Sequence, residues 1–126
     1  MAELDASLVF PKEGVTTTVR VELEGEGLYR LREHPPFVES ASYGDLVRGI
    51  ELDDGSVEFV AVVERSKLVG VHGLMSREQI DSPALSAVLS RVLESGGYWQ
   101  RDFGGYLSVF FDPERYDPRP ELEGTP

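Results

Sequence analysis

The chain has 126 residues, 40% of them hydrophobic, with 23 Asp and Glu against 12 Lys and Arg, two His and no Cys. This composition predicts one folded domain whose surface carries the formal net charge of -11. So negative a surface argues against nucleic-acid binding, which depends on Lys and Arg at phosphates, and the lack of Cys excludes disulfides and thiolate metal sites. No apolar run is long enough for a membrane span and no signal-peptide pattern opens the chain, so we expect a soluble, cytoplasmic protein.

The first half of the chain predicts two β-hairpins in tandem. Val15, Val19 and Val21 alternate with polar residues, as in a strand that buries one face. Glycine-containing turns at residues 25–27 and 53–55 separate the members of each hairpin. The four predicted strands cover residues 15–24, 28–33, 46–52 and 56–64. We expect them to form a curved or partly closed antiparallel sheet.

The second half predicts a strand, a helix and a third hairpin. The strand covers residues 67–75, an irregular turn follows, and the one main helix has Asp81 or Ser82 as its N-cap and Pro83 in its first turn. An apolar stripe along the helix faces a sheet, and Gly96-Gly97 ends it. Two strands, 98–103 and 106–111, complete a unit similar to half of a ferredoxin-like fold. The predicted fold class is α+β.

The predicted domain boundary lies near residue 112. Residues 1–112 are expected to form a single domain, and residues 113–126 an acidic, proline-rich tail that is partly mobile. Tyr116 and Leu122 are the apolar residues able to hold part of this tail against the domain.

Two short motifs stand about twenty residues apart. Tyr43-Gly44-Asp45 precedes one predicted strand, Glu64-Arg65-Ser66 ends another, and Tyr29-Arg30-Leu31 lies upstream of both. In this arrangement the chain resembles a family of small bacterial proteins classed only as a domain of unknown function, over roughly residues 19–111. The resemblance implies a fold and no activity. From the residues alone, Asp45 is expected to accept hydrogen bonds from turn amides.

Few residues are candidates for catalysis. His34 and His72 are the side chains able to transfer protons near neutral pH, but they do not have the spacing of metal ligands. No nucleophile motif or phosphate-binding loop is present. We therefore expect no catalytic residue, no metal and no cofactor, and the sequence leaves enzymatic activity open while arguing against it.

Two groups of residues are candidates for binding. Tyr98, Trp99 and Arg101 lie in an aromatic strand, and these residue types often anchor protein contacts. A second candidate, a small-ligand pocket in the mouth of the curved sheet, has four predicted residues. They are Tyr29, Tyr43, Asp45 and His72.

Three functions follow from these observations. The leading hypothesis is a non-enzymatic, acidic protein-binding module, for example an immunity or antitoxin-like inhibitor of a basic partner. The alternatives are a sensor domain for a small molecule or peptide, and a small enzyme that uses a histidine with a carboxylate. Each is compatible with a monomer or a homodimer, and none requires nucleic acid or a membrane.

Overall fold

The computed structural model describes residues 3–123 of the chain, which divides into two compact units. Unit 1 ends at Ser66 and unit 2 begins at Lys67. Each unit has its own hydrophobic core. The prediction of one domain over residues 1–112 stays a prediction.

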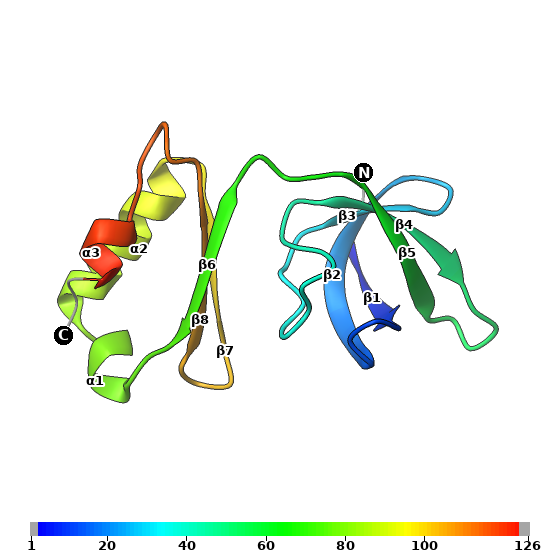
Figure 1. Ribbon diagram of the computed structural model, residues 1–126, viewed down its shortest axis with the longest axis horizontal. Helices are drawn as coiled ribbons and strands as arrows, with labels where there is room; N and C mark the ends of the chain where they lie inside the picture. The colour runs from blue at the N-terminus through cyan, green and yellow to red at the C-terminus, as the bar shows by residue number, and fades with distance from the viewer. Residues whose placement is uncertain (1–2, 124–126) are drawn as a thin grey trace. The chain divides into compact units, whose positions relative to one another are not determined.

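Unit 1 is a closed five-stranded barrel in which strands adjacent in sequence are also adjacent in space (Figure 1). Its strands are β1 (Glu3–Phe10), β2 (Val15–Gly25), β3 (Leu28–Leu31), β4 (Leu46–Glu51) and β5 (Val57–Glu64). Consecutive strands pair antiparallel, whereas a short parallel pairing of Leu8 with Val57 and Val9 with Glu58 closes the barrel. The two predicted hairpins are present. The sheet, which was expected to be curved or partly closed and antiparallel, is a closed barrel with one parallel pairing, because β1, which was not predicted, supplies the closure.

The barrel core follows from alternation along the strands. Ala6, Leu8 and Phe10 of β1 point inward and are buried together with Val19 and Val21 of β2. The predicted inward face of β2 is confirmed at these two valines. Farther along, Leu23 is exposed where the β2–β3 register shifts between Leu23 and Gly25.

Unit 2 places three helices on one face of a three-stranded antiparallel sheet whose order is β6-β8-β7 (Figure 1). Its elements are β6 (Val69–Leu74), α1 (Arg77–Ile80), α2 (Pro83–Glu94), β7 (Tyr98–Asp102), β8 (Tyr106–Phe111) and α3 (Arg119–Glu123). The α+β class and the strand, main helix and hairpin are confirmed. The predicted irregular turn after β6 is instead the short helix α1, which a capping box at Ser76 and Gln79 stabilises.

The main helix α2 begins as predicted. Ser82 is its N-cap, and the Ser82 hydroxyl accepts a hydrogen bond from the amide of Leu85 at 3.2 Å. Leu85, Leu89 and Val92 form the buried stripe that packs on Leu107, Val109 and Phe111 of β8.

Part of the predicted tail is folded. Tyr116 and Leu122 pack against the core of unit 2, as the sequence suggested, and Leu122 belongs to α3. The predicted mobility of the tail stays a prediction, and its last residues, 124–126, lie outside the described part of the chain.

Candidate functional site

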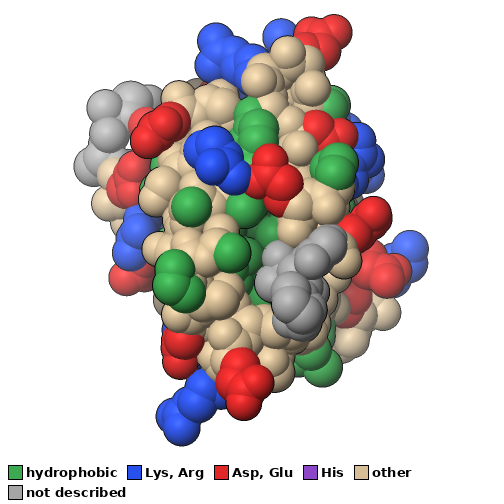
Figure 2. Space-filling model, turned by 90° about the vertical axis from the view of Figure 1, so that its left-hand side faces the viewer, with side chains coloured by type: hydrophobic (Ala, Val, Ile, Leu, Met, Phe, Trp, Pro, Cys, Tyr) green, Lys and Arg blue, Asp and Glu red, His purple; other side chains and the backbone are tan. Residues whose placement is uncertain are grey.

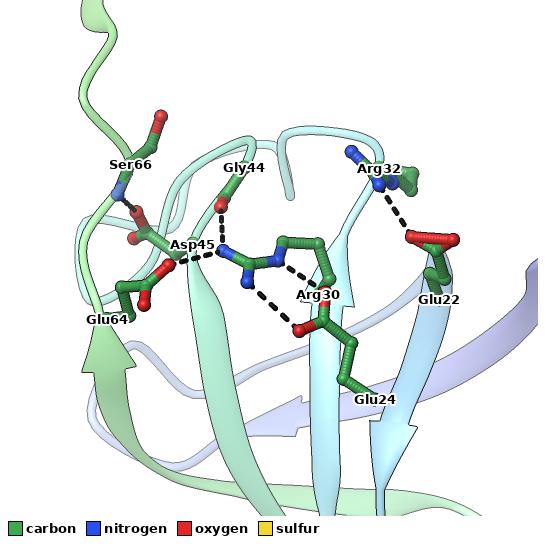
Figure 3. A network of polar contacts seen from close by, with 8 residues as sticks. All are labelled: Glu22, Glu24, Arg30, Arg32, Gly44, Asp45, Glu64 and Ser66. Atoms are coloured by element: carbon green, nitrogen blue, oxygen red, sulfur yellow. Dashed lines mark hydrogen bonds and ion pairs between the residues drawn. The ribbon is translucent and has the colours of Figure 1, made fainter. Parts of the chain in front are cut away.

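Asp45 connects the two motifs of unit 1. Its side chain is only 2% exposed and stands where the chain enters β4. Asp45 Oδ2 accepts a hydrogen bond from the amide of Ser42 at 2.9 Å. Asp45 Oδ1 accepts one from the amide of Ser66 at 2.7 Å, which Figure 3 shows. The guanidinium of Arg65 lies 3.6 Å from Oδ2. The expectation that Asp45 accepts hydrogen bonds from turn amides is confirmed, and the same carboxylate also holds the end of β5.

Gly44 allows Ser66 to lie close to the turn that holds Asp45. Its φ of +86° lies in the left-handed region, and a Cβ at this position would stand 2.9 Å from the hydroxyl oxygen of Ser66. Any other residue would therefore be strained and would push Ser66 away from Asp45. A structural requirement, the left-handed backbone next to Ser66, therefore explains why this motif has a glycine.

Arg30 completes the network from the neighbouring strand. Arg30 donates to both carboxylate oxygens of Glu24, at 2.7 and 3.0 Å, and its Nη1 donates to the Gly44 carbonyl oxygen and to Glu64 (Figure 3). These bonds raise the pKa of the guanidinium above its ordinary value, with the bond to Glu24 as the largest cause. The Tyr29-Arg30-Leu31, Tyr43-Gly44-Asp45 and Glu64-Arg65-Ser66 motifs therefore meet in one polar network that joins β2, β3, β4 and β5. The role of this network is structural, because it holds these strands together. We call its residues the clamp; they are Glu24, Arg30, Gly44, Asp45, Glu64 and Ser66.

The four residues of the predicted ligand pocket are divided between the units. Tyr29 is buried in the barrel core, and this burial raises the pKa of its hydroxyl. Asp45 belongs to the clamp, and Tyr43 is half-buried in the turn beside it. His72 lies in β6 of unit 2. As a pocket, this set stays a prediction.

His72 lies on the face of the unit 2 sheet that is turned away from the helices. Its Nδ1 is 2.9 Å from the hydroxyl of Ser108, and its ring contacts the rings of Tyr106 and Phe110. The His72 side chain is exposed at the edge of the sheet, but partial desolvation by its neighbours lowers the pKa of the imidazole below its ordinary value. Since Ser108 is itself fully buried, this pair is explained as part of the packing of the sheet.

The predicted partner-binding residues occupy both faces of β7. Trp99 is half-buried and packs against the core of unit 2 on the helix side. Tyr98 lies on the opposite face, where its hydroxyl donates to Gln100 at 3.2 Å. Arg101 is exposed, bonds to the Gly104 carbonyl oxygen, and lies 3.8 Å from Asp81. A role in partner binding for these three side chains stays a prediction.

The most exposed large hydrophobic side chains of the described residues lie at one end of this sheet. Leu74 is 84% exposed at the end of β6, and Phe103 is 75% exposed in the β7–β8 turn. The amide of Met75 donates to the Gly105 carbonyl oxygen at 2.8 Å, which joins the end of β6 to that turn. We call Leu74 and Phe103 the hydrophobic tip. The sequence analysis missed both residues, although a Phe directly before Gly104-Gly105 is an unusual turn residue.

Unit 2 also has a cavity of about 210 Å³ on its helix-bearing face. Figure 2 shows hydrophobic side chains gathered in a hollow on this face. Besides His72, whose ring lies on the other face of the sheet, the cavity is lined by Val71, Gly73, Met75, Leu107, Val109, Arg119, Leu122 and Glu123. It therefore lies between β6, β8 and α3.

The acidic charge is concentrated in unit 1. Residues 1–66 carry fourteen acidic and six basic side chains, a formal charge of −8, against nine and six for residues 67–126. Within residues 3–123, no group of three or more His, Asp or Glu side chains is arranged to hold a metal ion. None of the helices described there has the length and apolar character needed to cross a membrane.

The chain matches no family model and no curated protein. Among solved structures, it is similar to a hypothetical protein from Neisseria gonorrhoeae, with a TM-score of 0.66 and 18% sequence identity over 98% of this chain and 85% of that one. At this identity the similarity shows a shared fold and carries no function. The motif-level family resemblance stays a prediction.

Proposed function

We propose that this protein is a non-enzymatic, acidic protein-binding module, of the immunity or antitoxin-like kind, that docks a basic partner through the hydrophobic tip of unit 2. The observation that carries this proposal is that the two most exposed large hydrophobic side chains of the described residues, Leu74 and Phe103, lie at the same end of the unit 2 sheet.

The backbone of Phe103 has a φ of 54°, in the left-handed region where Gly and Asn are favoured. A bulky residue in this conformation costs on the order of 1–3 kcal/mol. The ring is 75% exposed and Leu74, at the same end of the sheet, is 84% exposed, and exposed apolar side chains of this size are typical of interaction sites.

The negative charge supports a basic partner. An excess of eleven acidic groups attracts a positively charged protein and accelerates its association, in a way that salt weakens. On this proposal, Arg101, Trp99 and Tyr98 support the tip: Arg101 holds the turn through Gly104, while Trp99 and Tyr98 anchor the two faces of the hairpin strand.

The test is an affinity pull-down of the tagged protein at low and high salt, followed by binding measurements with the purified partner. We expect a basic protein that is retained at low salt and released at high salt. Phe103→Asn is the decisive variant, because Asn tolerates the left-handed backbone and the change removes only the ring. It is expected to weaken partner binding at least tenfold without lowering the melting temperature.

Phe37→Asn is the matched control. Phe37 is also an exposed phenylalanine with positive φ, at 62°, but it lies in a loop of unit 1. This variant is expected to bind the partner as the unmodified protein does. Recovery of no specific protein, or equal binding by the Phe103 and Phe37 variants, would contradict the proposal.

The cavity of unit 2 favours one alternative, a sensor domain that binds a small molecule or peptide. Its lining is mainly apolar, with the charged side chains of Arg119 and Glu123 beside it. Thermal-shift screening of small ligands would test this function, because a ligand held in the cavity raises the melting temperature. A leucine-sized substitution that fills the cavity would abolish this rise.

A further inference from the structure

Strand β6 is an unprotected edge of the unit 2 sheet. Of the described strands, β8 alone pairs with β6, through six consecutive residue pairs without a bulge. The sequence of β6, VGVHGL, contains no Lys, Arg, Asp, Glu or Pro. The opposite edge strand, β7, carries Arg101 and Asp102. Charges, prolines and bulges are the usual means by which proteins prevent strand addition, and β6 has none of them.

The cavity lies beside this edge. Helix α2 packs on β7 and β8, while β6 lines the cavity with Val71 and Gly73. Side chains alternate along a strand, so an added strand would direct every second side chain toward the helix side of the sheet. There, one of them would reach the apolar walls that Leu107 and Leu122 provide.

The size of the cavity fits a side chain better than a whole ligand. Sites for small molecules usually measure about 300–1,000 Å³, and this cavity measures about 210 Å³. A hydrophobic side chain of an extended segment would be held by the cavity, while the main chain would be held by hydrogen bonds to β6.

The charges beside the cavity favour a basic segment. Arg119 is already engaged, since it donates to Asp117 at 2.7 Å and its guanidinium stands 5.2 Å from the ring centre of Phe111. Glu123 also lines the cavity, and unit 2 carries nine acidic against six basic side chains. A Lys or Arg next to the apolar anchor would therefore be attracted.

We propose that an extended segment of a protein partner adds to β6 as a fourth strand, with alternating apolar residues, one of them in the cavity, and with flanking Lys or Arg. This inference rests on the proposed protein-binding function and specifies the mode of recognition at a second place on unit 2.

Gly73→Ile is the variant that tests this mode. A Cβ at Gly73 meets no atom within 4 Å, and its φ is not in the left-handed region. A β-branched residue therefore fits the strand and places its side chain in the mouth of the cavity. Ala61→Ile, at an exposed position of β5, adds a larger side chain of the same type in the other unit and serves as the control.

The probe is a synthetic ten-residue peptide of alternating Leu and Lys, titrated into the full chain and followed by fluorescence anisotropy and amide hydrogen exchange. A peptide of the same composition with Leu and Lys in separate blocks controls for charge alone. We expect the alternating peptide to bind at least tenfold more tightly than the block peptide and to slow exchange of the β6 amides. Gly73→Ile is expected to weaken this binding at least tenfold, and Ala61→Ile less than twofold.

Equal binding of the two peptides, unchanged binding by Gly73→Ile, or slowed exchange outside β6 would overturn the inference. A homodimer that protects the β6 amides without peptide would also overturn it, because the edge would then belong to a second copy. If Phe103→Asn loses a captured partner while Gly73→Ile retains it fully, the proposed function stands and the strand addition fails. If the peptide result holds and no partner protein is captured, the proposed function fails and the β6 site remains.

Discussion

Asp45 shows how much one carboxylate contributes to unit 1. It accepts hydrogen bonds from the amides of Ser42 and Ser66, which are separated by more than twenty residues in sequence. Asp45→Ala would leave both partly buried amides without their acceptor, at up to about 1–3 kcal/mol each. We expect the free energy of unfolding to fall by about 2–5 kcal/mol, measured by urea denaturation.

Substitution of Arg65 separates the contribution of the ion pair from that of the amide hydrogen bonds to Asp45. Its side chain is 69% exposed and stands 3.6 Å from the same carboxylate, so solvent screens the ion pair. Arg65→Ala is therefore expected to cost less than about 1 kcal/mol. Equal losses for the two variants would mean that the charge pair, and not the amide bonds, holds this turn.

The imidazole of His72 predicts a pH dependence of stability. Partial desolvation lowers its pKa in the folded protein below the ordinary value of 6.5, so the unfolded chain binds the proton more readily. Its contribution is complete above pH 6.5 and is lost as the pH falls from there toward the lower folded-state pKa. His72→Gln keeps a polar group near Ser108 but does not titrate. The stability difference between the two proteins should therefore change as the pH is lowered through 6.5, and a constant difference would contradict this explanation.

Helix α2 depends on its N-cap. The hydroxyl of Ser82 accepts from the Leu85 amide and donates to the Gln79 carbonyl oxygen at 2.9 Å, which also ties α2 to the turn after α1. Ser82→Ala is expected to lower the free energy of unfolding by about 1 kcal/mol, whereas Ser82→Asp retains an acceptor and costs less. Chemical denaturation of both variants would check this order, and an equal loss would show that the bond to Gln79 is the important one.

The sequence predicted elements whose signals are local. Ser82, Pro83 and the apolar stripe define α2 within twelve residues, and the turns between hairpin strands carry their own glycines. β1 was not predicted, although Leu4, Ala6, Leu8 and Phe10 alternate with other residues. Barrel closure was not predictable, since it rests on the pairing of Leu8 with Val57 across about fifty residues.

In the candidate sites, too, local motifs were predictable and contacts between distant segments were not. The Tyr-Gly-Asp and Glu-Arg-Ser motifs were identified, but sequence alone does not show that Asp45 binds the amide of Ser66. Partner binding by Tyr98, Trp99 and Arg101 stays a prediction; in the structure Trp99 packs against the core of unit 2, while Phe103, which was not a predicted binding residue, is exposed. Exposure depends on which face each strand turns toward the helices, and this is decided by the sheet order β6-β8-β7.

At the scale of the whole molecule, the important feature is that the chain has two separate cores. Leu31 lies in the barrel core and Leu85 in the core of unit 2, and both are completely buried. Replacing a buried Leu with Ala usually costs about 2–5 kcal/mol. Two cores formed by separate stretches of chain predict two unfolding transitions.

Calorimetry of Leu31→Ala and Leu85→Ala tests this prediction. Each variant is expected to lower the melting temperature of one transition and to leave the other within about 1 °C, because stability changes at independent sites add. The double variant should show both shifts together. A single transition that both variants lower equally would instead support the one cooperative domain that the composition predicts, and the cores would then have to stabilise each other.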